Sequence, residues 1–275
     1  MPASGQPWDP LFASRSPLYR PYLQLLTDWS ERPNWPDAEH YRSLVERERA
    51  SRAPELKPLD FQTMAPRPRR ARQRIESLEQ LYDGSIALRA QVPCLAASYH
   101  DLFNALMFAA FPRAKRALHE RQFRALRERT PALPARLPGA RTTEQDALTI
   151  FDEGGSVLVL SERAAGALLS GEELCLDIDD PPRALVFGHA ILEHALSPTE
   201  AAPPLRSSAL LLVGDELPEP RQLLDRVDRF LAARLSSERD FLDTASEAIL
   251  LVHPDGRLRA TRGRAAALPR PLPCL

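Results

Sequence analysis

Proline is the residue that most constrains how this chain can fold. The 275 residues include 27 prolines but only 11 glycines, and this proline share is roughly twice the usual one of about 5%. Proline lacks a backbone N–H and clashes with the preceding helical turn, so a helix tends to begin at a proline or to end before it. The sequence therefore predicts many interrupted segments rather than a few long continuous ones.

Charge and cysteine content restrict the possible partners and the compartment. The 36 basic and 37 acidic residues leave a formal net charge of -1, so no overall field attracts nucleic acid or an anionic membrane. Cys94, Cys175 and Cys274 are widely spaced and form no C-x-x-C pair, which is typical of reduced thiols in a cytosol. No apolar run approaches the roughly 20 residues that a membrane span needs. We therefore expect a cytoplasmic protein without a membrane partner, in which any contact with nucleic acid would depend on a local basic patch.

Changes in composition suggest three regions. Residues 1–36 mix aromatic residues with prolines, as expected of an arm that packs against a larger body. Residues 37–252 carry the periodic apolar patterns of a single α+β domain. Residues 253–275 are basic and interrupted by prolines, so we expect a disordered tail.

The central region is predicted to be rich in helix, with a small antiparallel sheet. Apolar runs at 147–151 and 156–160 flank Asp-Glu-Gly-Gly, a signal for a β-hairpin over 147–160. Ser98 is a suitable N-cap for the helix that follows it. Pro112 is suitable for the first turn of the next helix. The predicted helices cover 37–52, 75–91, 98–110, 113–129, 161–169, 181–196 and 220–235, and further strands cover 207–213 and 249–252.

Three strings in a fixed order resemble a known family. They are YHDLFNAL at 99–106 leading into FPRAK at 111–115, DALTIFDEG at 146–154, and FGHAILE at 187–193. Together they resemble the bacterial domain-of-unknown-function family 3025. Tyr99 stands where the family has tryptophan, and Cys94-Leu95 stands where it has Thr-Arg. The resemblance implies no catalytic assignment, so chemistry must be argued from the residues themselves.

The first candidate group lies at the start of the predicted helix 98–110. His100 and Asn104 are one turn apart on the same face, and Asp101 adjoins His100. His100 can act as a general base or a metal ligand, with Asn104 orienting it. Alternatively, Asp101 caps the helix and Asn104 bonds to a neighbouring loop.

The second candidate group has the same spacing on the helix 181–196. His189 and Glu193 are four residues apart and share one face, and Gly188 would allow another backbone to come close. The pair can place an imidazole and a carboxylate on one divalent cation. A structural hydrogen-bonded pair is the alternative interpretation.

Asp152 and Glu153 would add two carboxylates at the tip of the predicted hairpin. Turn chemistry alone can explain an acidic pair next to glycines. If this tip meets both histidine helices, His100, His189 and Glu193 become candidate ligands of one divalent metal, or the histidines form a general acid–base pair. Asp152 and Glu153 would then bind the metal or the substrate.

The helix 113–129 is strongly basic and contributes a separate hypothesis. It contains Arg113 and Lys115 at its start and further arginines along its length. These side chains can bind an anionic ligand, or they can simply form a solvated face.

Two functions follow from these patterns. The first is an enzyme of hydrolytic or metal-assisted type that uses His100, Asp101, Asn104, His189 and Glu193. The second is a non-catalytic binding module in which the same residues form a buried structural network, while the basic helix contacts an acidic partner.

Overall fold

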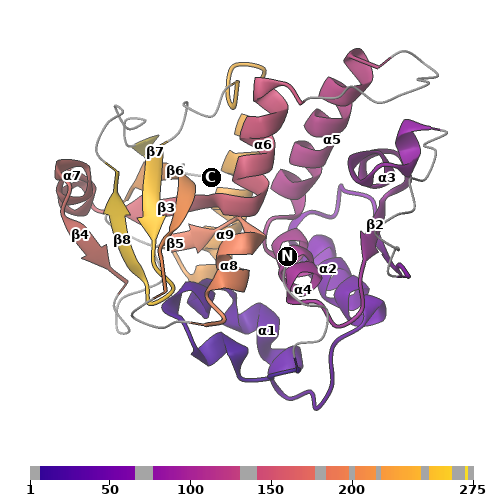
Figure 1. Ribbon diagram of the computed structural model, residues 1–275, viewed down its shortest axis with the longest axis horizontal. Coiled ribbons are helices and arrows are strands. Elements are labelled where there is room, and N and C mark those ends of the chain that lie inside the picture. The colour runs from indigo at the N-terminus through magenta and orange to yellow at the C-terminus, as the bar shows by residue number, and fades with distance from the viewer. Residues whose placement is uncertain are drawn as a thin grey trace.

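The computed structural model describes residues 7–65, 77–130, 141–176, 184–197, 202–214, 218–242, 248–261 and 270–271 (Figure 1). The α-helices are α1 (Leu23–Ser30), α2 (Ala38–Arg52), α3 (Tyr82–Arg89), α4 (Tyr99–Ala110), α5 (Pro112–Glu128), α6 (Thr143–Gly154), α7 (Glu162–Ser170), α8 (His189–His194) and α9 (Pro220–Ser236). The strands are β1 (Asp60–Thr63), β2 (Gln91–Cys94), β3 (Gly155–Leu160), β4 (Glu173–Cys175), β5 (Ala184–Val186), β6 (Leu205–Val213), β7 (Ala248–Val252), β8 (Arg257–Ala260) and β9 (Arg270–Pro271).

The helix-rich α+β class predicted from the sequence is confirmed. Figure 1 shows the strands of the larger sheet gathered on one side of the molecule and α2 to α5 on the other, with α6 and α8 between them. The larger sheet has the strand order β4-β8-β7-β6-β3-β5, and β9 pairs with β6. It is larger than expected and is mixed rather than antiparallel, because β3 and β6 are parallel. The small pair β1 and β2 is also parallel.

The predicted hairpin over 147–160 is wrong, because its first half is the end of α6. The Thr142 side chain accepts a hydrogen bond from the Gln145 backbone, and the Gln145 side chain accepts one from the Thr142 backbone. This capping box starts a helix upstream of the apolar run. Leu148 and Phe151 then face the core three residues apart, as a helical period requires. The chain enters β3 directly at Gly155.

Most other predicted elements match the structure to within a few residues. Ser98 caps α4 through the Asp101 backbone N–H, and Pro112 lies in the first turn of α5. The segment 75–91 differs: its described part forms a short 3-10 turn, Leu78–Gln80, followed by α3, and β2 already begins at Gln91. The helix expected over 181–196 is limited to α8 and follows β5.

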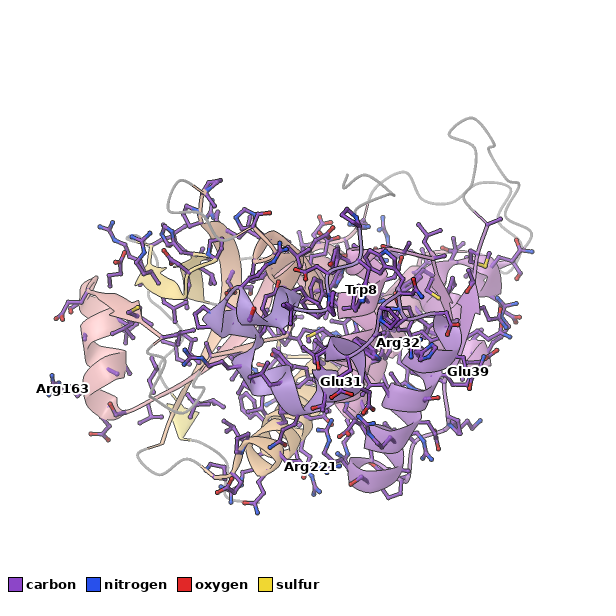
Figure 2. The ribbon with its side chains drawn as sticks, turned by 90° about the horizontal axis from the view of Figure 1, so that it is seen from below. Trp8, Glu31, Arg32, Glu39, Arg163 and Arg221 are labelled. Carbon is purple, nitrogen blue, oxygen red and sulfur yellow. The ribbon has the colours of Figure 1, made fainter. Side chains whose placement is uncertain are left out.

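The described part of the proline- and aromatic-rich arm is packed into the core. The Trp8 indole N–H donates to the Arg32 carbonyl at 2.8 Å, and Figure 2 shows these two residues close together. Tyr19 donates to the Leu192 carbonyl in α8, and Tyr22 donates to the Val186 carbonyl in β5, each at 2.6 Å. The arm therefore fixes the segment that carries His189.

The start of the expected tail is part of the sheet. Residues 253–256 form a turn, and β8 then pairs antiparallel with β7 and with β4. Disorder is therefore wrong for residues 253–261, and the reason is that Leu258 supplies a buried side chain to the sheet. Apart from 270–271, the rest of the tail lies outside the described residues. None of the helices in the described part of the chain combines the length and hydropathy needed to cross a membrane.

Candidate functional site

The end of α6 and the start of α8 lie against each other, and this contact builds the site. The backbone N–H groups of Phe187 and Gly188 both donate to the Gly155 carbonyl. A Cβ on Gly188 would lie 2.4 Å from the Glu153 carbonyl oxygen, so only glycine allows this close approach. The sequence prediction for Gly188 thus matches its surroundings. As a result, the first residue of α8, His189, is held beside Asp152.

The two candidate histidines are in direct contact. Nε2 of His189 lies 3.0 Å from Nε2 of His100, and the ring centroids are 4.5 Å apart and nearly perpendicular. The His189 residue is only 4% exposed, whereas 48% of the His100 side chain is exposed. The pair therefore connects the protein interior with its surface.

The hydrogen-bond partners determine which nitrogen carries each proton. Nδ1 of His189 lies 3.0 Å from the Asp152 carbonyl oxygen, which can only accept, so Nδ1 must donate. A neutral His189 then has its lone pair on Nε2, and His100 must donate to it through Nε2–H. The remaining nitrogen, Nδ1 of His100, lies 3.5 Å from Asp101 Oδ1. Nδ1 of His100 is therefore the nitrogen of the pair that is left to exchange a proton.

The two imidazoles have opposite pKa shifts. Asp101 is the main cause that raises the pKa of His100, helped by Glu193 and Glu153. Burial lowers the pKa of His189 to about 4, and the nearby charges of Lys115 and His100 act in the same direction. Near neutral pH the arrangement therefore places the shared proton on His100 and leaves His189 neutral.

Asp152 connects this pair to a buried cation. Its carboxylate oxygen Oδ1 lies 2.5 Å from Nζ of Lys115, and Lys115 is fully buried. Burial alone would raise the pKa of Asp152, but Lys115, with His119 and His189, holds it well below its usual range. The sequence predicts that Lys115 binds an anionic ligand; in the structure its ammonium group pairs with Asp152 instead.

Three other carboxylates act on the exposed side of the pair. Asp101 also accepts a hydrogen bond from the Leu95 backbone N–H through Oδ2, rather than closing a capping box. Glu193 is partly buried, and burial raises its pKa. Glu153 is exposed, in the last turn of α6. The surroundings of His100 are therefore rich in negative charge.

Two predicted site residues have other partners. Asn104 donates from Nδ2 to the Tyr82 hydroxyl at 2.6 Å, so it pairs with α3 and does not orient His100. Arg113 contacts Glu55, Asp225 and Asp228. Its guanidinium group is held by these carboxylates at the junction of α5 and α9, and its binding of a ligand together with Lys115 stays a prediction.

The basic helix is not a uniformly solvated face. Arg121 is 2% exposed; it pairs with Glu144 and donates to the carbonyls of Leu235, Ser237 and Asp240. Arg124 and Arg127, by contrast, are exposed. The reason for the difference is that α5 packs against α9 along one side, which buries every third or fourth side chain whatever its charge.

The predicted metal ligands do not form a three-ligand group. No set of three His, Cys, Asp or Glu side chains within the described residues has a geometry that could hold one metal ion. His100 and His189 instead hydrogen-bond to each other, and His189 uses its second nitrogen for the Asp152 carbonyl. The geometry thus favours proton exchange over shared coordination.

His119 is a buried polar residue that the sequence reasoning missed. It is 1% exposed, its Nδ1 lies 2.9 Å from Asp83 Oδ1, and its ring stacks on Phe108. In the described structure its Nε2 is buried without a partner. A signal was present, because Lys115 and His119 are one turn apart beside the apolar Ala114 and Leu118.

Comparison with known proteins identifies one family. A family model described as "Protein of unknown function (DUF3025)" matches residues 71–249, which include every residue of the site described above. No curated protein and no solved structure matches the chain.

Proposed function

Since the chain belongs to the DUF3025 family, which is described only as of unknown function, we propose its activity from the geometry of the site. The protein is an enzyme of hydrolytic type, in which His100 exchanges a proton with the substrate and His189 holds His100 in position. The observation that carries this proposal is the 3.0 Å contact between Nε2 of the half-exposed His100 and Nε2 of the buried His189.

In the proposed reaction, one proton is taken up and then released at Nδ1 of His100. When neutral, His100 keeps its Nε2–H bonded to His189, and Nδ1 accepts a proton from the attacking water. The resulting imidazolium is stabilised by Asp101, and it then gives the Nδ1 proton to the leaving group. His189 and the Asp152 carbonyl act as positioning groups, as the acidic partner of histidine does in hydrolytic triads.

The charge around His100 supports a substrate class. Asp101, Glu153 and Glu193 lie close enough to His100 to raise its pKa, so neutral or cationic substrates are favoured over anionic ones. An anionic ligand of helix α5 would have to contact its exposed end, near Arg124 and Arg127. The cytoplasmic location of a bacterial protein remains our prediction from cysteine and charge content.

A substrate screen with matched variants tests the proposal. Chromogenic esters, amides, phosphodiesters and glycosides, each in neutral and cationic form, would be offered to the wild type and to His100→Gln and His189→Gln. We expect the wild type to hydrolyse one class, and His100→Gln to lose about 10²-fold or more in kcat. His194→Gln is the control, since His194 is on α8 but bonds to the Pro203 carbonyl.

Two results would count against the enzyme. Full activity of His100→Gln would remove His100 from the reaction. If the folded wild type hydrolysed none of the four classes, the non-catalytic module would be favoured. That alternative draws on the part-buried pairs Asn104–Tyr82, His119–Asp83 and Lys115–Asp152, all of which can serve only to fix how the helices pack.

A further inference from the structure

Lys115 is a fully buried cation whose counter-charge is the carboxylate of Asp152. Its Nζ lies 2.5 Å from Asp152 Oδ1 and 4.9 Å and 5.8 Å from the ring centroids of Phe108 and Phe187. The aromatic rings attract the cation weakly, but they cannot hydrogen-bond to it as a carboxylate does. A buried ammonium and a buried carboxylate each require such pairing.

Asp152 contacts both Lys115 and His189, through different groups. Its side chain binds Lys115, and its backbone carbonyl accepts from Nδ1 of His189. His119 and His189 are the other basic groups whose charge acts on this carboxylate. Without the ammonium of Lys115, the Asp152 carboxylate, whose side chain is only 14% exposed, would favour a second proton on one of these imidazoles, because an unpaired charge with little solvent is costly.

We propose that Lys115 is a positioning residue of the His100–His189 pair: it occupies the Asp152 carboxylate, so that His189 stays neutral and keeps the Nε2 lone pair directed at His100. This inference rests on the proposed acid–base pair, but it concerns a hydrogen bond that can be measured without any substrate. In this proposal Lys115 acts through Asp152 and thereby sets the direction of the His100–His189 hydrogen bond.

The consequence of losing Lys115 follows from the number of donors. If His189 gains a proton, its Nε2 becomes N–H and faces Nε2–H of His100. Two donors at 3.0 Å cannot bond to each other, and two imidazolium rings at this distance repel. The hydrogen bond can persist only if His100 gives up its Nε2 proton and accepts from His189, so that the direction of the bond reverses.

Nitrogen-15 NMR of labelled imidazoles at pH 7 tests this directly. In the wild type, we expect Nε2 of His189 to show the chemical shift of an unprotonated nitrogen and a scalar coupling to Nε2 of His100 across the hydrogen bond. In Lys115→Met, which replaces the ammonium by an apolar group of similar length, we expect Nε2 of His189 to show the shift of a protonated nitrogen.

Two further variants separate positioning from general destabilisation. Leu231→Ala removes a fully buried side chain of α9 and should lower the melting temperature without changing the His189 signal. Lys115→Met combined with Asp152→Asn removes the ammonium and the carboxylate together, so the wild-type shift of His189 Nε2 should return.

The outcomes are distinct even if a variant fails to fold. A wild-type His189 signal in folded Lys115→Met would overturn the proposal. If Lys115→Met alone does not fold, the double variant decides: an unprotonated Nε2 of His189 supports the role of Lys115, and a protonated His189 refutes it. Because no substrate is present, inactivity of the protein in the hydrolysis screen would leave this result unaffected.

Discussion

Nε2 of His100 lies 3.0 Å from Nε2 of His189, although 89 residues separate the two histidines in the sequence. One ring belongs to the first turn of α4 and the other to the first turn of α8. Burial and carboxylates shift their pKa values in opposite directions, which is the condition for one group to carry the proton and the other to accept its hydrogen bond.

Acid should destabilise the protein through His189. Its pKa falls from 6.5 in the unfolded chain to about 4 in the folded one, so the unfolded chain binds more protons between these values. Stability should therefore decrease as the pH falls from 6.5 towards 4, by an amount on the order of 3 kcal/mol. Urea unfolding of the wild type and His189→Gln at pH 7 and pH 4.5 measures this. An equal loss in both proteins would contradict the assignment.

Carboxylates near His100 should control its pKa in a definite order. Asp101→Asn should lower the pKa of His100 more than Glu193→Gln does, because Asp101 is the larger cause of the upward shift. Both changes should move any activity that requires protonated His100 to lower pH. NMR titration of the His100 ring measures the pKa directly, with exposed Glu162→Gln in α7 as the control. The reverse order would show that Glu193 is the closer partner in solution.

Gly188→Ala should separate α8 from the end of α6. The added Cβ would meet backbone atoms of Glu153 and Gly154 at 2.4 to 2.5 Å, and backbone cannot move aside as a side chain can. We expect a loss of about 1–3 kcal/mol in the free energy of unfolding and a weaker His189 bond to the Asp152 carbonyl. Gly166→Ala in α7 is the control: its Cβ would meet nothing within 4 Å, so it should stabilise by about 0.5–1 kcal/mol. Similar unfolding curves for both variants would reject the close-approach argument.

Arginines of α5 should differ sharply in their effect on stability. Arg121→Met leaves Glu144 and three backbone carbonyls without a buried donor, which should cost about 3–5 kcal/mol. Arg124→Met, at an exposed position of the same helix, should change stability by no more than about 0.5 kcal/mol. Thermal unfolding distinguishes the two. Variants that test whether α5 binds an anionic partner should therefore substitute Arg124 and Arg127 and retain Arg121.

Local signals in the sequence predicted much of the secondary structure. Ser98 and Pro112 marked the start of α4 and α5, because capping and the missing proline N–H act within one turn. The apolar run at 147–151 is ambiguous, because a short run fits both a helical and an extended period. Only the capping box at Thr142 and Gln145 distinguishes them, and it lies upstream of the run.

The sequence by itself determined the α+β class, the family resemblance, and which residue types could carry chemistry, since composition, periodicity and motif order are properties of the chain. Tertiary structure decided their partners: His100 with His189, Lys115 with Asp152, Asn104 with Tyr82, and Arg113 with the carboxylates of α9. The physical reason is that burial and charge pairing depend on which helices pack together. A basic residue on α5 is buried if another helix, such as α9 or α6, packs over it, and it is solvated if none does. No local sequence pattern encodes which of the two occurs.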